Sequence, residues 1–151
     1  MACCALCACG FVPMYSDGRA LRAELADVHI APIAGTNGID LRNYLILAWN
    51  TANDPNAKYE LKVKLNDPIT IYKGLQRSGD ATWEEVRMTA SWTLSADGKV
   101  IAQASETASE SYTFVSDLVS ASAAKTNATQ NAIAGIAQKI EMKVNAKLKN
   151  P

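Results

Sequence analysis

Strict alternation of apolar and polar residues predicts two central strands in this chain. Positions 59–66 alternate one apolar residue with one polar residue, and positions 85–94 repeat the pattern. A period of two is typical of a strand that buries one face. Pro68 interrupts the first of these runs, and Ile69 and Ile71 are expected to extend that strand beyond a kink. The apolar members are Tyr59, Leu61, Val63 and Leu65 in the first strand, and Val86, Met88, Ala90, Trp92 and Leu94 in the second.

Shorter signals predict two further strands and the turns around them. The first strand is expected at 27–33, with Val28 and Ile30 on one side, and the last at 100–114. Asp97-Gly98 suits the tight hairpin before the last strand, because these residues accept the positive backbone torsions of such turns. Positions 74–79 are expected to form a loop.

Two segments carry apolar residues at the three-and-four spacing of a helix. The first is expected at 39–51, after a turn at 35–38 that can cap it, and the second at 119–147. One face of each should pack on the sheet. The stripes are Leu41, Tyr44, Leu45, Ala48 and Trp49 in the first helix, and Ile133, Ile136, Ala137, Ile140, Val144 and Leu148 in the second.

This order of elements predicts an α+β fold. A two-layer sandwich is expected, with a small four-stranded, mostly antiparallel sheet packed by two helices in the order β-α-β-β-β-α. A chain of 151 residues suits one domain, placed at 27–151.

Charge and hydropathy exclude some partners. Fifteen basic and fifteen acidic residues balance, which argues against a nucleic-acid binder driven by net charge. Since no apolar run approaches the roughly 20 residues of a membrane-spanning helix, any membrane attachment should use an anchor.

All four cysteines lie in the first nine residues, at Cys3, Cys4, Cys7 and Cys9. Leu6-Cys7-Ala8-Cys9 fits a bacterial lipobox, in which an aliphatic residue and two small ones precede the cysteine that is acylated. Residues 1–8 are therefore expected to be a truncated signal peptide, and residues 9–26 the lipidated N-terminus and its tether. Secretory signals normally open with a basic stretch, so the true start codon is expected upstream. A thiolate metal site is the alternative, although no histidine or acidic ligand lies nearby.

Few residues could support catalysis, and no enzyme activity, metal or cofactor is expected. His29 is the one histidine and lies in a predicted strand, where ordinary hydrogen bonds suffice to explain it. Glu84 and Glu85, and likewise Glu106 and Glu110, are expected on solvated strand surfaces. The serine and threonine run from 105 to 111 should form the outer face of a strand.

Basic residues near the central hairpins form the candidate binding site. Lys73, Arg77, Arg87 and Lys99 could engage phosphates, and arginine can do so with two hydrogen bonds. The alternative is that they are scattered solubilising charges. Trp83, at a strand entry, is the tryptophan expected at the surface, since Trp49 and Trp92 fall on core faces.

The chain resembles the LPS-assembly lipoprotein (LptE) family, in the form found in alphaproteobacteria. The segment after the lipobox, Cys9-Gly10-Phe11-Val12-Pro13-Met14-Tyr15, is similar to the family's common Cys-Gly-Phe-x-Pro-Leu-Tyr pattern. Further similar segments are Val28-His29-Ile30-Ala31-Pro32-Ile33, Leu41-Arg42-Asn43-Tyr44-Leu45, Gly79-Asp80-Ala81-Thr82, Thr89-Ala90-Ser91-Trp92-Thr93-Leu94 and Gly98-Lys99-Val100.

The resemblance implies a non-enzymatic role at the outer membrane. Family members are anchored by their acyl chains to its periplasmic side, fill the lumen of the LptD β-barrel, assist its assembly and help lipopolysaccharide reach the cell surface. Lipopolysaccharide and an LptD-type barrel are thus the expected partners. Two alternatives remain, namely a generic envelope lipoprotein that binds a peptide, glycan or peptidoglycan component, and a periplasmic hydrolase built around His29.

Overall fold

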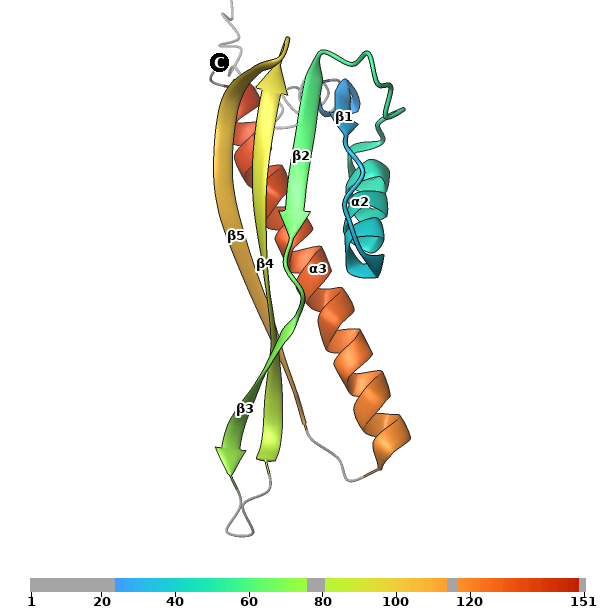
Figure 1. The fold of residues 1–151 in the computed structure, drawn as a ribbon, viewed down its shortest axis with the longest axis vertical. Coiled ribbons are helices and arrows are strands. Elements are labelled where there is room, and N and C mark those ends of the chain that lie inside the picture. Colours follow the sequence, from blue (N-terminus) through green and yellow to red (C-terminus); the bar gives the residue numbers. More distant parts are fainter. Residues whose placement is uncertain (1–23, 76–80, 114–116, 150–151) are drawn as a thin grey trace, which may run out of the picture.

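The computed structural model describes residues 24–75, 81–113 and 117–149 (Figure 1). The elements in chain order are β1 (Val28–Ile30), α2 (Thr36–Trp49), β2 (Tyr59–Leu65), β3 (Ile69–Leu75), β4 (Ala81–Ala96), β5 (Lys99–Thr113) and α3 (Leu118–Lys149). Neither helix combines the length and the apolar character that crossing a bilayer requires.

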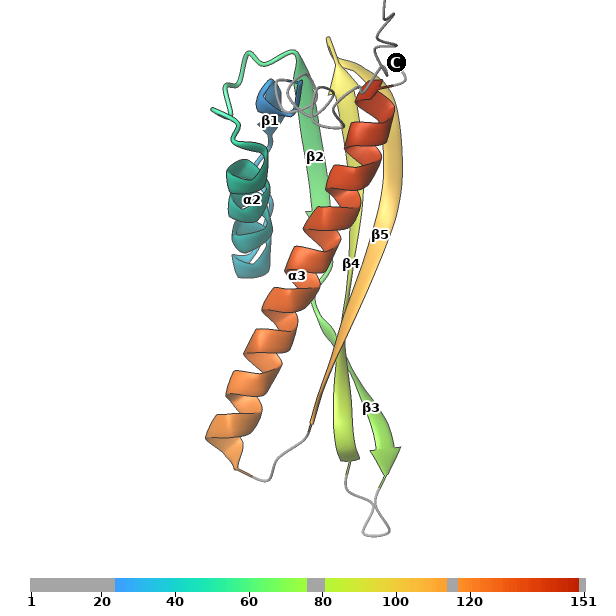
Figure 2. The ribbon, with the colours of Figure 1, turned by 180° about the vertical axis from the view of Figure 1, so that it is seen from behind.

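The long strand β4 organises a five-stranded sheet. β5 pairs along one side of β4, while β2 and β3 pair one after the other along its other side. β1 adds to β2 in parallel, and the other pairs are antiparallel. Both helices lie on the same side of the sheet, with α3 running diagonally behind β4 and β5 (Figures 1 and 2). The predicted α+β two-layer class is confirmed.

The core lies between the helices and the sheet face that they cover, here called the inner face; the opposite side is the outer face. The predicted alternation along β4 is confirmed, because its apolar members are buried on the inner face. Burying one such side chain fully contributes about 1.5–3 kcal/mol. They meet Ile133, Ile136, Ile140 and Val144 of α3 and Leu41, Leu45 and Trp49 of α2 in one cluster.

The sheet has a fifth strand because the chain breaks its register at Asp67-Pro68. Leu65 pairs with Ala90, and Ile69 pairs with Arg87. Between these two pairs the chain advances by four residues, whereas its partner β4 moves back by only three, so one residue is extra. A shift of one residue turns every following side chain to the opposite face. Ile69 and Ile71 therefore lie on the outer face, and the expected loop at 74–79 is already strand as far as residue 75.

The first helix differs from the prediction at both ends and in its stripe. It begins at Thr36 and ends at Trp49, where Asn50 adopts a left-handed conformation with φ 50°. Tyr44 and Ala48 were expected to pack on the sheet, but both are exposed. The buried face is narrower and follows a four-residue spacing, so the helix displays apolar side chains on several sides.

Candidate functional site

Two basic side chains of neighbouring strands share one carboxylate on the outer face. Arg87 Nη2 lies 2.7 Å from Glu85 Oε1, and Lys73 Nζ lies 3.4 Å from Glu85 Oε2. Lys73 comes from β3 and the other two residues come from β4. We call these three residues the cation cluster.

The cation cluster keeps an excess positive charge. The hydrogen bond from Arg87, together with the charge of Lys73, lowers the pKa of the Glu85 carboxyl below its usual value. Glu85 therefore stays ionised and offsets one of the two cations. The Glu85 side chain is only 14% exposed, whereas the two basic side chains are 40% and 44% exposed. Both cations can thus turn part of their hydrogen-bonding capacity toward an anion in solution.

Large apolar side chains flank the cation cluster on the same face. Trp83 pairs across the strands with Lys73, and Ile69 pairs with Arg87. Trp83 is 49% exposed, as the sequence predicted, and Ile69 is 62% exposed. Ile71 lies between them, opposite Glu85. The outer face at this end of the sheet therefore presents charge and apolar surface side by side.

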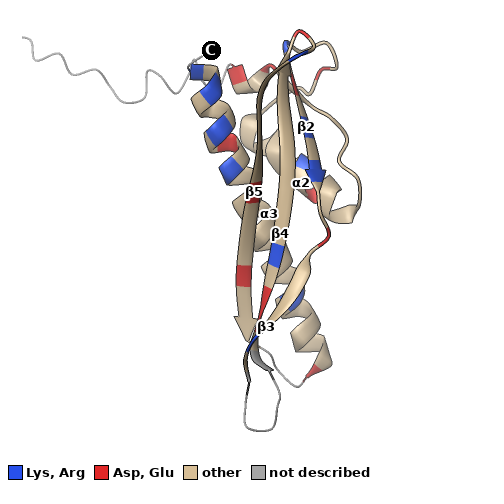
Figure 3. Ribbon diagram, turned by 60° about the vertical axis from the view of Figure 1, so that its left-hand side comes forward, with Lys and Arg blue, Asp and Glu red and all other residues tan. Residues whose placement is uncertain are grey.

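The structure brings together only part of the predicted basic site. Lys73 and Arg87 meet in the cation cluster. Lys99 pairs with Ala96 in the hairpin at the opposite end of β4, so it does not join them. Arg77 lies outside the described residues. Figure 3 shows other basic residues on β2 and along the second half of α3, away from the cluster.

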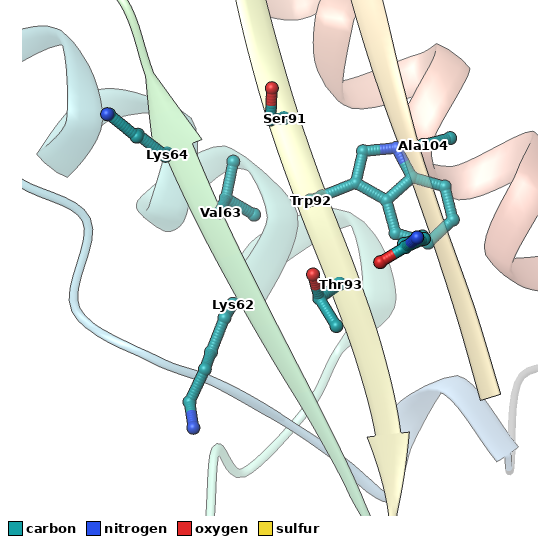
Figure 4. Close-up of a pocket in the computed structure, with 8 residues that line it drawn as sticks. Lys62, Val63, Lys64, Ser91, Trp92, Thr93 and Ala104 are labelled. Atoms are coloured by element: carbon teal, nitrogen blue, oxygen red, sulfur yellow. The ribbon is translucent and has the colours of Figure 1, made fainter. Parts of the chain in front are cut away.

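Hydroxyl groups line much of the outer face of β5. The run predicted there is confirmed, since Ser105, Thr107, Ser109 and Ser111 are all exposed. The Thr89 and Thr107 hydroxyls lie 3.0 Å apart across β4 and β5. A shallow hollow of about 530 Å³ lies among β2, β4 and β5 (Figure 4). It is lined by Lys62, Val63, Lys64, Ser91, Trp92, Thr93, Gln103 and Ala104.

Two carboxylates that were expected on solvated surfaces are buried on the inner face. Glu84 is 7% exposed and Glu106 is 6% exposed. Tyr112 Oη donates a hydrogen bond to Glu84, and Trp92 Nε1 donates one to Glu106 over 3.2 Å. The prediction was wrong because alternation places Glu84 of β4 and Glu106 of β5 inward, whatever their polarity. The residue type of Glu84 and Glu106 alone did not indicate that buried hydrogen-bond donors would face them.

His29 makes a hydrogen bond that needs no catalytic explanation. Its Nδ1 lies 3.2 Å from the backbone oxygen of Asn53, which helps join β1 to the segment after α2. Within the described ranges no three potential metal ligands gather into one site. The four cysteines, with Cys9 among them, lie outside those ranges.

Several solved structures share this fold. A candidate lipoprotein from Caulobacter crescentus superimposes with a TM-score of 0.73 at 21% identity, over 88% of this chain and 98% of that one. The rare lipoprotein B of Shewanella oneidensis gives a TM-score of 0.65 at 12% identity, over 82% and 96%. A minor lipoprotein from Acinetobacter baumannii gives 0.57 at 19%, over 80% and 92%.

At identities this low, the structural likeness establishes a shared fold alone. The three neighbours are matched over almost their whole length. No protein-family model matches the sequence, and no curated protein does.

Proposed function

We propose that this chain is a lipid-anchored plug of the LptE type. Acylation at Cys9 holds it on the periplasmic side of the outer membrane. There it fills the lumen of an LptD-type barrel, assists assembly of that barrel and helps to pass lipopolysaccharide to the cell surface. Its role is one of binding and shape, without catalysis.

Two independent observations support an envelope lipoprotein. Leu6-Cys7-Ala8-Cys9 fits the lipobox pattern, with Cys9 as the cysteine to be acylated. The fold is shared with proteins described as lipoproteins in three bacteria. An acyl anchor adds a second attachment to any protein contact, and thereby raises the local concentration of a plug near its barrel.

The cation cluster beside Trp83 and Ile69 is the observation that supports lipopolysaccharide as the ligand. This lipid joins phosphate groups to acyl chains in one molecule. Lys73 and Arg87 offer charged donors to phosphate, and the exposed indole and isoleucine offer apolar surface next to them. A small inorganic anion would use the first feature and leave the second exposed.

The polar outer face supports the barrel as the partner. The interior of a wide transmembrane barrel is polar, so a plug needs a surface that can form hydrogen bonds with it. The exposed hydroxyls of β5 supply such a surface over most of its length.

Titration of purified lipopolysaccharide into the full chain tests this proposal. The double variant Lys73→Gln, Arg87→Gln should bind at least about tenfold more weakly, because charge-assisted hydrogen bonds contribute about 1.5–3 kcal/mol each. Lys99→Gln is the matched control, since it removes one cation at the far end of β4. Its affinity should equal that of the parent.

Salt provides the second arm of the experiment. Raising the ionic strength should weaken lipopolysaccharide binding by the parent markedly and binding by the double variant little, because screening acts on exposed charges. An equal loss of lipopolysaccharide affinity in the double variant and in Lys99→Gln would contradict a binding site at the cation cluster. Saturable binding of a peptidoglycan fragment, with no binding of lipopolysaccharide, would favour the generic envelope lipoprotein instead.

A further inference from the structure

In the described part of the chain, β1, β5 and β3 each have one side that pairs with no other strand. An uncovered edge exposes backbone N–H and C=O groups that can pair with another chain, and proteins usually block such edges. Side chains bond several of these groups on β1 and one in the middle of β5.

Side chains bond the outward groups of β1. Thr51 Oγ1 donates to the carbonyl of Val28 over 2.8 Å, and Asn53 Oδ1 accepts from the N–H of Ile30 over 2.6 Å. Arg42 Nε donates to the carbonyl of Ile30 over 3.0 Å. Three of the outward backbone groups of this edge are therefore already bonded to side chains.

The middle of the β5 edge is blocked from α3. The carbonyl of Thr89 accepts a hydrogen bond from the N–H of Asn66, so the backbone of Thr89 faces the β2 side of β4. Thr107 pairs with Thr89 on the other side, and its own backbone groups consequently point away from β4. Lys139 Nζ donates to the Thr107 carbonyl. Glu106, which points inward beside it, adds a charge that disfavours edge pairing.

The β3 edge lacks such protection. The same alternation along β4 gives Ile69 and Ile71 the backbone hydrogen bonds with that strand. The N–H and C=O groups of Thr70 and Tyr72 therefore point outward. Among the described residues none forms a hydrogen bond with these groups. Figure 1 shows β3 lying beyond the end of α2, which covers no part of this edge.

We propose that the β3 edge is a docking site for an extended segment of a partner protein, which adds antiparallel as a sixth strand. The outer side of that segment carries apolar residues beside Ile69 and Ile71 and an acidic residue beside Lys73. This contact goes beyond the proposed function, since it uses the backbone edge and needs no lipid.

The shape of the edge specifies a strand as its occupant. The outward groups of Thr70 and Tyr72 are two residues apart, which is the hydrogen-bonding repeat of a β-ladder. Exposed side chains also flank the edge on both faces, with Ile69 62% exposed on the outer face and Tyr72 68% exposed on the inner face. A strand that is added here covers part of both.

Charge favours a different protein over a second copy of this chain. Antiparallel pairing of two β3 strands about Ile71 would set Lys73 of each copy opposite Ile69 of the other. Since Ile69 pairs with Arg87, the cation clusters of the two copies would lie close together and repel. An acidic residue on a partner strand is instead attracted by the excess charge of the cluster.

A titration followed by nuclear magnetic resonance tests the edge. The probe is the peptide acetyl-Thr-Glu-Thr-Val-Thr-Val-Thr-amide, added to the full chain without lipid. Its glutamate aligns with Lys73 and its two valines with Ile71 and Ile69. At a peptide concentration ten times its Kd, hydrogen exchange of the Thr70 and Tyr72 amides should slow about tenfold. The amides of Ile69 and Ile71, which already bond β4, should change little.

Variants of peptide and protein make the test specific. A peptide with lysine in place of glutamate should bind about two- to tenfold more weakly. Thr70→Pro should bind the peptide about tenfold more weakly or worse, because proline removes an outward donor. The matched control Thr70→Val keeps the N–H and the branched shape, so it should bind like the parent. Lipopolysaccharide binding should persist in Thr70→Pro, because Lys73 and Arg87 remain.

Three results would overturn the proposal. The first is unchanged hydrogen exchange of the Thr70 and Tyr72 amides at the highest peptide concentration, whether the peptide shifts resonances elsewhere in the protein or shifts none at all. The second is equal peptide affinity of Thr70→Pro and Thr70→Val, with both variants folded as judged by their spectra. The third is protection of these amides that rises with protein concentration alone, which would assign the edge to a second copy.

Discussion

Lys143 Nζ lies 2.7 Å from Glu106 Oε1, and this contact joins the second half of α3 to the inner face of β5. The carboxylate is nearly inaccessible, whereas the lysine side chain is 53% exposed. The long lysine stem therefore brings a hydrated cation to a carboxylate that solvent barely reaches. The indole of Trp92 bonds the same oxygen. A single acidic residue within the core is thus held by one strand and one helix.

Removing the lysine should destabilise the fold. Lys143→Met leaves Glu106 with the Trp92 hydrogen bond alone, and we expect the free energy of unfolding to fall by about 1–2 kcal/mol. Urea unfolding followed by circular dichroism measures the loss. The double variant Lys143→Met, Glu106→Met should recover most of it, because no buried charge remains. A double variant less stable than the single one would show that the pair itself stabilises the fold.

Glycine substitutions in the two helices should have opposite effects. A Cβ on Gly38 would lie 2.8 Å from Ile33 Cγ2 and 2.9 Å from the Ile33 carbonyl oxygen. Gly38→Ala must therefore push α2 away from the chain before it, at a cost of about 1–3 kcal/mol. A Cβ on Gly135 meets Ala108 Cβ at an ordinary 3.4 Å. Gly135→Ala should stabilise α3 by about 0.5–1 kcal/mol. Thermal unfolding should show a lower midpoint temperature for Gly38→Ala and a higher one for Gly135→Ala.

Tyr112 should make stability fall at alkaline pH. Burial, and then the hydrogen bond to Glu84, raises the pKa of the Tyr112 hydroxyl well above its usual value. The unfolded chain loses this proton near pH 10 while the folded chain keeps it, so stability is full below about pH 10 and decreases above it. Urea midpoints measured between pH 8 and 11 should show this decrease.

The phenylalanine variant isolates this effect. Tyr112→Phe should be less stable at pH 8 by about 1 kcal/mol, because it leaves the Glu84 carboxylate without its donor. It should also lose less stability than the parent as the pH rises from 10 to 11. Tyr44→Phe, at an exposed position of α2, is the matched control. Parallel pH curves for the parent and Tyr112→Phe would refute the assignment.

Neutralising the acid of the cation cluster should strengthen ligand binding. Glu85→Gln removes the carboxylate that occupies both Lys73 and Arg87, and raises the local charge by one unit. Lipopolysaccharide affinity should rise by about two- to fivefold at low salt, the range of an exposed ion pair. Glu60→Gln, which frees only Lys62 on β2, is the control and should leave affinity unchanged. Weaker binding by Glu85→Gln would mean that the cluster does not meet the anion.

The alternation of strands and the three-and-four spacing of helices predicted the parts of the fold that local sequence controls. The inward side chains of β4 and the α3 stripe are confirmed because each follows from one element's own geometry. The β3 strand could not be placed in the same way. Ile69 and Ile71 were expected to extend the first central strand beyond a kink, but Asp67-Pro68 adds one residue against β4 and places both on the outer face of a separate strand. Such a break depends on pairing with a distant strand.

The candidate site was predictable in the same partial way. Lys73 and Arg87 were selected by charge and position, and the structure places them on one carboxylate. Their partner Glu85 was missed because its spacing fits any solvated strand. Lys99 is separated from the cluster by the full length of β4, and the alternation pattern covered only part of that strand. The role of Arg77 and the acylation of Cys9 stay predictions.

Native mass spectrometry of the protein, purified from detergent-solubilised outer membranes of its source, tests the central claim most directly. We predict a mature chain that begins at Cys9, carries the mass of attached acyl chains and is bound one-to-one to a large β-barrel protein. A chain found alone, with residues 1–8 still present and an unmodified thiol at Cys9, would contradict both the anchor and the plug.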